Sequence, residues 1–365
     1  MTVSLGIVGC GDVAFRTYLP GLAPIIADGS ACVAVCFDPI QERAERAAAQ
    51  YPGARAVNSL EELLEHPGLT AGVNLTPAPF HRDVTTALLM AGLHVFSEKP
   101  IASTVEDGQA LIELARQQGK LLLCAPAVMA TNRMQWLKRV IGDGRIGRPT
   151  LATAQMANMG PSGWRQYTGD PAVFYSAGVG PLIDTGVYVL HTITGLLGPA
   201  KRVQALGGIV IPKRTVTIER LLGQEIEVST NDQMLIQLDF GGNVFAQVLS
   251  SFAVPRSKAP VLELHGTNGT VSISASDWYD ANGPVDIFVR DESPLGVEDW
   301  MEVAPPVPSL HDSLIGAGVP HLVACIDGIE QPILTAEHAC HVLEIMLKAG
   351  QAAPTGETLD IETTF

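Results

Sequence analysis

The sequence predicts an α/β protein with an N-terminal Rossmann fold, a doubly wound parallel sheet, followed by a C-terminal α/β domain on a large, open, mostly antiparallel sheet. Over residues 1–125, short continuous apolar runs alternate with helical patterns, which is typical of strands covered on both faces. Later strands alternate apolar and polar residues between glycine-rich turns, as in an antiparallel sheet with one exposed face. We therefore expect two domains, residues 1–125 and residues 126–365.

Five apolar runs of the first domain have the length and the flanking residues of buried strands. They are Ser4–Val8, Cys32–Phe37, Gly72–Leu75, His94–Ser97 and Leu121–Ala125. Capping boxes at Ser59 and Ser103 predict two helix starts, because a serine three residues before glutamate can satisfy free N–H groups. Another helix, over residues 81–91, is expected to stop at Gly92.

The second domain begins and ends with helical patterns and has strands between them. Helices are predicted over residues 132–141, 181–197, 318–328 and 336–349. Strands are predicted at Gln233–Phe240, Val244–Phe252, Val261–His265 and Thr270–Ile273.

Composition excludes several classes of partner. The formal net charge is -15 with only 23 Lys+Arg, so neither nucleic acid nor an anionic membrane surface is expected to bind. No apolar run has the length of a membrane span, and the start of the chain has no signal-peptide pattern.

The six cysteines form no C-x-x-C pair and are expected to be buried thiols in a reducing cytoplasm. The histidines are scattered, so no metal site is expected.

The first predicted strand leads directly into a Gly-x-Gly-x-x-Ala turn that ends at Ala14. In a dinucleotide site, Gly9 would allow the tight turn, Gly11 would let the backbone approach a pyrophosphate, and Ala14 would allow close packing of helix and strand. A second match, at residues 142–147, follows an amphipathic helix rather than a strand. We interpret that second match as a helix stop and a turn.

Asp38 ends the second predicted strand. A carboxylate there would accept hydrogen bonds from the adenosine ribose and repel a 2′-phosphate, which favours NAD(H) over NADP(H). The alternative is that Asp38 only precedes Pro39 in a turn and caps the next helix.

Glu98-Lys99-Pro100 follows the strand His94–Ser97. A lysine at the end of a later strand of the same sheet would lie where a nicotinamide ring is expected. His81 would cap its helix and shape the nicotinamide side of the site, although capping could be its whole role. Gly9, Gly11, Asp38 and Lys99 are therefore expected to contact the cofactor.

Four motifs in order resemble the Gfo/Idh/MocA oxidoreductases, the superfamily of glucose–fructose oxidoreductase and inositol dehydrogenase. They are the glycine turn, Leu75-Thr76-Pro77 with His81, Glu98-Lys99-Pro100, and residues 178–188. The resemblance implies a Rossmann domain and a second domain whose open sheet builds homodimers or homotetramers. It also implies hydride transfer between nicotinamide and a sugar, cyclitol or related carbonyl, with Lys99 beside the reacting oxygen. With this resemblance, cofactor contacts are assigned to Gly9, Gly11, Asp12, Val13, Asp38, Thr76, Pro77, His81, Glu98 and Lys99.

The chain departs from many family members, which carry histidine in place of Tyr188 and aspartate in place of His191. With tyrosine at this position, the chain resembles the branch of the family that contains glucose–fructose oxidoreductase, dimeric dihydrodiol dehydrogenase, xylose dehydrogenase and some keto-sugar reductases. We therefore expect an NAD(P)-dependent oxidoreductase acting on a sugar, keto-sugar or related polyol. A trans-dihydrodiol dehydrogenase and a non-catalytic NAD-binding regulator are alternatives, although retention of both Lys99 and Tyr188 favours an enzyme.

The helix after Pro181 carries a polar stripe on an otherwise apolar pattern. Asp184, Tyr188 and His191 are spaced i, i+4 and i+7, so they share one face of an α-helix. We expect Tyr188 to exchange a proton with the substrate and Asp184 to orient a substrate hydroxyl or Lys99. A phenol with a pKa near ~10 needs a nearby ammonium to act at neutral pH, which Lys99 would supply. A structural tyrosine at a domain interface is the alternative.

Three further residues are candidate substrate contacts. Trp164 and Arg165 follow a glycine-containing loop, and an aromatic ring with a guanidinium suits sugar stacking and hydroxyl contacts. An oligomer-contact loop is an equal alternative for this pair. His191 is either a partner behind the substrate contacts or a core histidine.

Overall fold

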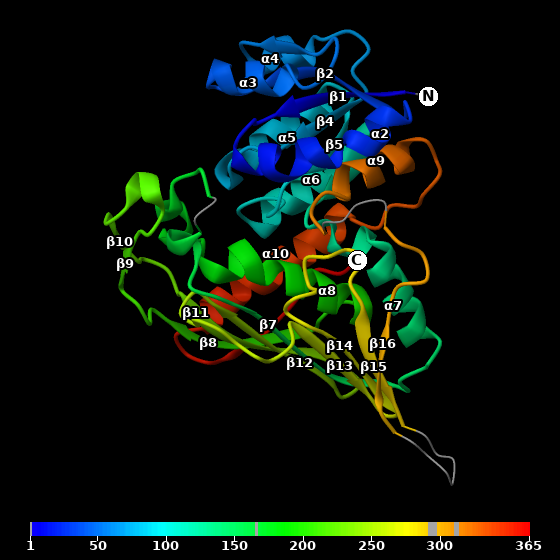
Figure 1. Cartoon of the computed structure of the whole chain (residues 1–365), viewed down its shortest axis with the longest axis vertical. Coiled ribbons are helices and arrows are strands. Elements are labelled where there is room, and N and C mark those ends of the chain that lie inside the picture. The colour runs from blue at the N-terminus through cyan, green and yellow to red at the C-terminus, as the bar shows by residue number, and fades with distance from the viewer. Residues whose placement is uncertain (1, 165–166, 291–297, 310–313) are drawn as a thin grey trace. The chain divides into compact units, whose positions relative to one another are not determined.

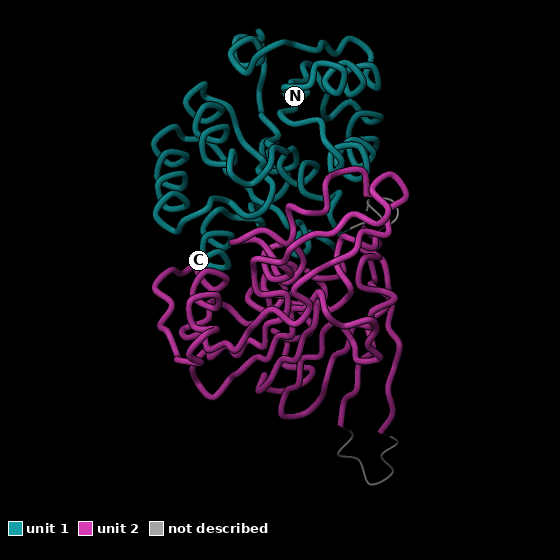
Figure 2. The backbone as a smooth tube through the Cα atoms, turned by 90° about the vertical axis from the view of Figure 1, so that its left-hand side faces the viewer, with its two compact units in different colours: residues 1–131, 310–343 teal, residues 132–309, 344–365 magenta. Residues whose placement is uncertain are grey.

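The computed structural model describes residues 2–164, 167–290, 298–309 and 314–365 (Figure 1). The chain forms two compact units (Figure 2). Unit 1 comprises Met1–Thr131 and Leu310–Leu343, and unit 2 comprises Asn132–Ser309 and Glu344–Phe365. The boundary predicted near residue 125 divides the chain at one point, whereas in the structure Leu310–Leu343 belongs to the first unit.

Unit 1 is built on a six-stranded sheet in the order β3-β2-β1-β4-β5-β6, and every neighbouring pair is parallel. The strands are β1 Val3–Val8, β2 Ala31–Phe37, β3 Arg55–Val57, β4 Ala71–Asn74, β5 His94–Ser97 and β6 Leu122–Cys124. The predicted doubly wound sheet is confirmed. The sequence did not indicate β3, a short edge strand in which only Val57 is buried. The strand order reverses between β1 and β4, and ligands bind at such switch points.

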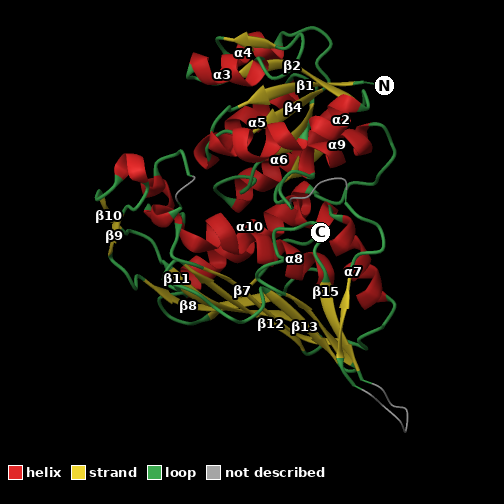
Figure 3. Cartoon of the chain, in the orientation of Figure 1, coloured by secondary structure: helices red, strands yellow, loops and turns green. Residues whose placement is uncertain are grey.

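Helices and single helical turns connect the strands of unit 1 or follow the last of them (Figure 3). They are η1 Ala14–Tyr18, α1 Leu19–Gly21, α2 Ala23–Ala27, α3 Gln41–Ala48, α4 Leu60–Leu64, η2 Ala78–Phe80, α5 His81–Met90, α6 Val105–Gln118, η3 Ala127–Ala130 and α9 Gly318–Ile326. Ser59 caps α4 as predicted, since its Oγ accepts the Glu62 N–H at 3.2 Å. The prediction for α6 is wrong by one residue, because Thr104 rather than Ser103 accepts the Asp107 N–H, at 3.1 Å.

Unit 2 is built on a nine-stranded sheet in the order β16-β15-β14-β13-β7-β12-β11-β8-β17. Its strands are β7 Pro149–Ala157, β8 Arg202–Gly208, β11 Gln233–Gly241, β12 Val244–Ser251, β13 Leu262–Gly266, β14 Gly269–Ile273, β15 Val285–Val289, β16 Trp300–Val303 and β17 Thr358–Asp360. The predicted open, mostly antiparallel sheet is confirmed, and within the described part of the chain β7 and β12 are its only parallel pair. The sequence analysis missed the central strand β7, because it begins with a proline and contains three alanines, which are poor strand formers.

The two faces of the unit 2 sheet differ. Along β11 the even-numbered residues are buried and several odd-numbered ones are exposed, among them Leu235. Helical segments η6 Leu182–Gly186 and α8 Val187–Leu197 pack on β7 and β12. The remaining elements are α7 Asn132–Gly142, η4 Pro161–Gly163, η5 Pro171–Tyr175, η7 Glu219–Leu221 and the hairpin of β9 Lys213–Thr215 with β10 Glu225–Glu227. Helix α10, Ala336–Ala352, runs through the point where the unit assignment changes.

Helix α7 ends at Gly142, so the second glycine pattern is a helix stop and turn, as predicted. All six cysteines are free thiols, but Cys32 is exposed, so the expectation that all are buried is wrong for this residue. Among the described residues, no helix has both the length and the hydropathy needed to cross a membrane.

Candidate active site

The glycine turn after β1 has the shape that a pyrophosphate needs. Gly9 has φ +90°, and a Cβ there would lie 2.7 Å from the carbonyl carbon of Leu75, so only glycine fits. A Cβ on Gly11 would meet nothing within 4 Å, so the backbone there borders open space. The turn therefore fits a dinucleotide cofactor, whose phosphates would approach the Gly11 backbone and the helix start beyond it.

The Asp38 side chain holds this turn in place through hydrogen bonds. Its side chain is only 6% exposed, and Oδ2 accepts the Cys10 N–H at 2.8 Å while Oδ1 accepts the Ile40 N–H at 2.9 Å. The bond to Ile40 makes the predicted turn, but the side chain does not cap α3. A carboxylate oxygen has two lone pairs, so a ribose hydroxyl could still be accepted, and the ribose contact stays a prediction.

Asp12 and Val13 start the helical segment after the turn, which continues as the π-helical η1. The Asp12 carboxylate forms an ion pair with Arg16, one turn further on. These two residues would therefore bind a phosphate through their backbone N–H groups rather than through their side chains.

Glu98 is a buried brace at the end of β5. Its Oε1 accepts the Tyr18 hydroxyl at 2.6 Å, and its Oε2 accepts the Lys99 N–H at 2.8 Å. Both carboxylate oxygens therefore hold the start of the Glu98-Lys99-Pro100 segment against η1. Lys99 itself is half-buried at the strand end.

His81 joins two segments that the sequence analysis placed near the nicotinamide. Its ring is 1% exposed, with Nδ1 at 2.6 Å from the Pro100 carbonyl oxygen and Nε2 at 2.7 Å from the Thr76 carbonyl oxygen. The ring thus bridges the carbonyl groups of Thr76 and Pro100. The predicted capping role is wrong, because Phe80 is the N-cap of α5 and the His81 side chain bonds elsewhere.

The predicted cofactor residues of unit 1 thus lie after strands β1, β2, β4 and β5, whose ends are neighbours in the sheet. Thr76 and Pro77 follow β4, and Asn74 holds Thr76 through both its N–H, at 3.2 Å, and its hydroxyl, at 2.6 Å. Carboxyl ends of parallel strands at a switch point are where open α/β sheets bind ligands.

In unit 2, the helix with the polar stripe starts with a wider turn than predicted. Residues Leu182–Gly186 are π-helical, and α-helical geometry begins at Val187. Such π turns occur often at functional sites. They change the angular offset between Asp184 and Tyr188, although both side chains are buried, as is His191. Gly186 permits close contact with β12, because a Cβ there would lie 2.7 Å from Ser250 Oγ.

Tyr279 is a residue of this region that the sequence analysis missed. Its ring packs edge-on against Tyr188, with centroids 6.4 Å apart and an interplanar angle of 73°. Burial of the hydroxyl raises the pKa of Tyr279 to about 12, and the nearby Asp184 carboxylate adds to this effect. The Tyr279 phenol is therefore a proton-bearing hydrogen-bond donor at neutral pH. No motif marks this tyrosine, which follows β14 in an irregular segment.

The other predicted substrate residues have separate surroundings. Trp164 packs on Phe174 with ring centroids 6.2 Å apart, beside a buried apolar cluster around Tyr175. Arg165 lies outside the described residues. Among the residues that the structure does describe, no group of three metal-binding side chains occurs.

The fold and the glycine turn define a class of protein: oxidoreductases that bind a dinucleotide on a Rossmann fold. The model of the "Oxidoreductase family, NAD-binding Rossmann fold" (GFO_IDH_MocA) matches residues 3–125, and the model of the "GFO/IDH/MocA C-terminal domain" matches residues 134–272. The chain belongs to the Gfo/Idh/MocA oxidoreductase family, as its motifs predicted.

Two curated relatives match over most of their length. The chain is 26% identical to 1,5-anhydro-D-fructose reductase of Ensifer adhaerens, covering 98% of each chain. It is 23% identical to trans-1,2-dihydrobenzene-1,2-diol dehydrogenase of Macaca fuscata fuscata, covering 84% of this chain and 85% of that protein. The crystal structure of an NAD-binding oxidoreductase from Klebsiella pneumoniae has the same fold, with a TM-score of 0.81, 19% identity and full coverage of both chains.

Proposed function

We propose that the protein is an NAD-dependent dehydrogenase or reductase of a sugar, keto-sugar or related polyol, in the tyrosine-type branch of its family. The observation that carries this proposal is the pyrophosphate-shaped turn at Gly9 and Gly11 in a chain that keeps both Lys99 and Tyr188. The relative that reduces 1,5-anhydro-D-fructose supports the substrate class.

Proton transfer in this proposal is carried by Lys99 and Tyr188. When bound, the nicotinamide supplies the hydride donor or acceptor. In the direction of reduction, the Tyr188 hydroxyl gives its proton to the substrate oxygen, and the Lys99 ammonium stabilises the resulting phenolate. In oxidation both transfers run in reverse. Asp184 accepts a hydrogen bond from a second substrate hydroxyl or from Lys99.

Tyr279 has a different role from Tyr188 in the proposal. Because its pKa is raised to about 12, it keeps its proton at neutral pH and acts as a fixed hydrogen-bond donor to a substrate oxygen. The Tyr188–Tyr279 pair also offers an aromatic wall. This wall favours a second candidate substrate, a trans-dihydrodiol, whose ring would pack on aromatic side chains.

NAD(H) is proposed over NADP(H) because of Asp38. A buried carboxylate at the end of β2 would repel a 2′-phosphate. Its two backbone hydrogen bonds fix the carboxylate at that place, which supports the proposed discrimination.

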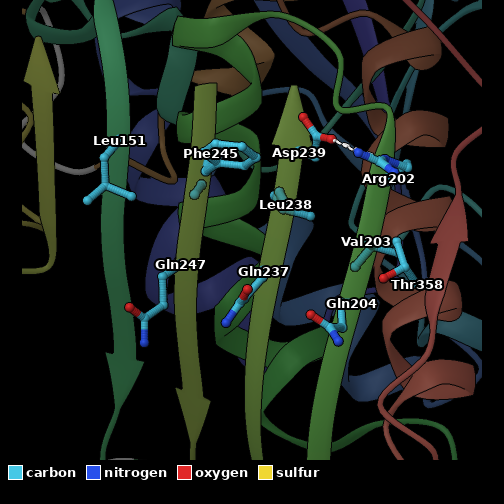
Figure 4. A pocket seen from close by; sticks show the side chains of 11 residues that line it. Leu151, Arg202, Val203, Gln204, Gln237, Leu238, Asp239, Phe245, Gln247 and Thr358 are labelled. Atoms are coloured by element: carbon cyan, nitrogen blue, oxygen red, sulfur yellow. Dashed lines mark hydrogen bonds and ion pairs between the residues drawn. The ribbon is translucent and has the colours of Figure 1, made fainter. Parts of the chain in front are cut away.

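A homodimer or homotetramer through the outer face of the unit 2 sheet is also proposed. This face carries exposed apolar side chains, including Phe245, Leu235 and Leu206. A hollow of about 340 Å³ on this face is lined by Phe245 and by Gln204, Gln237 and Gln247, which come from three neighbouring strands (Figure 4). Phe245→Glu should convert the oligomer to a monomer in light scattering, while a wild-type monomer at micromolar concentration would refute the assembly.

The function is tested by titrating the purified protein with NAD and NADP, followed by an NAD-coupled screen of sugars, keto-sugars, polyols and a trans-dihydrodiol. Turnover of one sugar class that is lost in Tyr188→Phe is expected. Tight cofactor binding with no turnover of any of these substrates would contradict the proposed activity.

A further inference from the structure

Arg133, the second residue of α7, is held by a single distant segment. Its side chain is 0% exposed. Nη1 donates to the Asp277 carbonyl at 2.7 Å and Nη2 to the Trp278 carbonyl at 2.9 Å, and Nη1 also lies 3.5 Å from the Gly283 carbonyl. All three acceptors belong to residues 277–283, the segment that carries Tyr279. The guanidinium therefore closes this segment into a loop.

Closing the loop with a buried guanidinium costs free energy, because the charge is removed from water. No carboxylate of the described residues forms an ion pair with Arg133, and its Nε is buried without a hydrogen-bond partner. Burial lowers the pKa of Arg133 to about 10, although Asp280 and Asp277 oppose the shift, so the side chain is still charged at neutral pH. A buried charge whose hydrogen-bond partners are neutral carbonyl groups lowers stability. In this protein the same charge fixes the geometry of the loop.

Other residues of the loop are shaped around this guanidinium. A Cβ on Gly283 would lie 3.0 Å from Arg133 Nη1 and 3.0 Å from the Asp277 carbonyl oxygen, so the closure needs glycine there. Trp278 is fully buried and anchors the residue next to Tyr279. Tyr279 is 47% exposed, yet its ring contacts the buried Tyr188.

We infer that Arg133 is a positioning residue that sets Tyr279 against Tyr188 and so determines how the substrate oxygen is held. This inference rests on the proposed function, in which Tyr279 donates to the substrate. Arg133 would act only through the loop, without touching the substrate.

The test is a double-mutant cycle between Arg133 and Tyr279. Arg133→Met should lower kcat/KM about 10-fold in the wild type but less than about 2-fold in a Tyr279→Ala background, because residues that act as one unit are not additive. Arg133→Lys should recover part of the loss, and the NAD affinity should not change. Arg139→Met is the matched control, since Arg139 is an exposed arginine of the same helix, and it should behave as wild type. Equal losses in both backgrounds would overturn the inference.

Two further measurements keep the outcome decisive. Amide hydrogen exchange over residues 277–283 should be faster by at least about 10-fold in Arg133→Met than in Arg139→Met, and unchanged protection would overturn the inference even if no substrate is turned over. If no substrate is turned over but the protection of residues 277–283 is lost in Arg133→Met, the proposed function fails while the role of Arg133 in closing the loop stands. If Arg133→Met does not fold, Gly283→Ala disturbs the same closure from the loop side and should reproduce the 10-fold loss.

Discussion

The cofactor region of unit 1 and the tyrosine region of unit 2 are built in different ways. In unit 1 the backbone forms the site: Gly9 and Gly11 shape the turn, while Asp38, Glu98 and His81 hold backbone groups in place. In unit 2 the groups proposed to react are side chains, and Tyr188 and Tyr279 come from segments far apart in the sequence. We therefore expect cofactor binding in unit 1 to tolerate the loss of a nearby side chain better than the chemistry proposed for unit 2 does.

Lys99→Met tests whether the two regions separate binding from chemistry. The variant should keep its NAD affinity, because the turn at Gly9 and Gly11 is untouched, while kcat/KM falls by at least ~10²-fold, the scale for a positioned proton-transfer group. Cofactor titration and initial rates measure the two effects. Near-normal turnover would move the chemistry away from Lys99.

Tyr279→Phe sharpens the distinction within unit 2. The change keeps the ring contact with Tyr188 and removes only the hydroxyl, so kcat/KM should fall by roughly 10-fold, the value of one hydrogen bond to a substrate oxygen. A rate profile measured from pH 6 to pH 9 should keep its shape, because the raised pKa of Tyr279 places its titration above this range. A profile that loses one of its limbs would instead make Tyr279 the acid/base.

Asp38→Ser tests the brace of the cofactor turn. The change removes the acceptor of the Cys10 and Ile40 N–H groups as well as the negative charge. We expect NAD to bind several-fold more weakly and NADP several-fold more tightly, on the order of 1 kcal/mol in each direction. Asp38→Asn is the control that keeps the shape of the side chain. A wild type that already prefers NADP in the same titration would contradict the assignment.

Glu344 gives unit 2 a pH dependence of stability that is separate from the chemistry. Burial would raise the pKa of Glu344, but hydrogen bonds from Lys348 and Thr363 and from the backbone of Glu362 and Thr363 lower it to about 2. A lowered folded-state pKa stabilises the fold above the unfolded value near ~4.3 and loses this effect as pH falls toward 2. Glu344→Gln should cost about 2 kcal/mol at pH 7 and progressively less below pH ~4 in thermal melts.

The contrast between backbone and side-chain sites also explains what the sequence could predict. The strand-turn-helix order around Gly9 and the strand end before Lys99 follow from local patterns, so the unit 1 sheet was predictable. Strand β7 was not, because Ala152 and Ala154 are buried through the packing of neighbouring elements, although alanine itself is a poor strand former.

The misses within the site have a common physical cause. The π-helical turn before Tyr188 depends on packing against β12, where Gly186 meets Ser250. Tyr279 and Arg133 gain their places only through contacts between distant segments. His81 resembled a cap because it follows Thr76-Pro77, yet tertiary contacts to two carbonyl groups determine its role.

One comparison tests the central claim that Tyr188 carries the proton: kcat/KM of Tyr188→Phe against His191→Ala, on the same substrate. Tyr188→Phe keeps the packing of the ring, so it should fold, bind NAD normally and lose at least ~10²-fold. His191→Ala should lose less than ~10-fold, and Tyr188→His should recover some activity, because an imidazole can also transfer a proton. If His191→Ala is the inactive variant and Tyr188→Phe turns over normally, the proton passes through His191 and the assignment of Tyr188 is wrong.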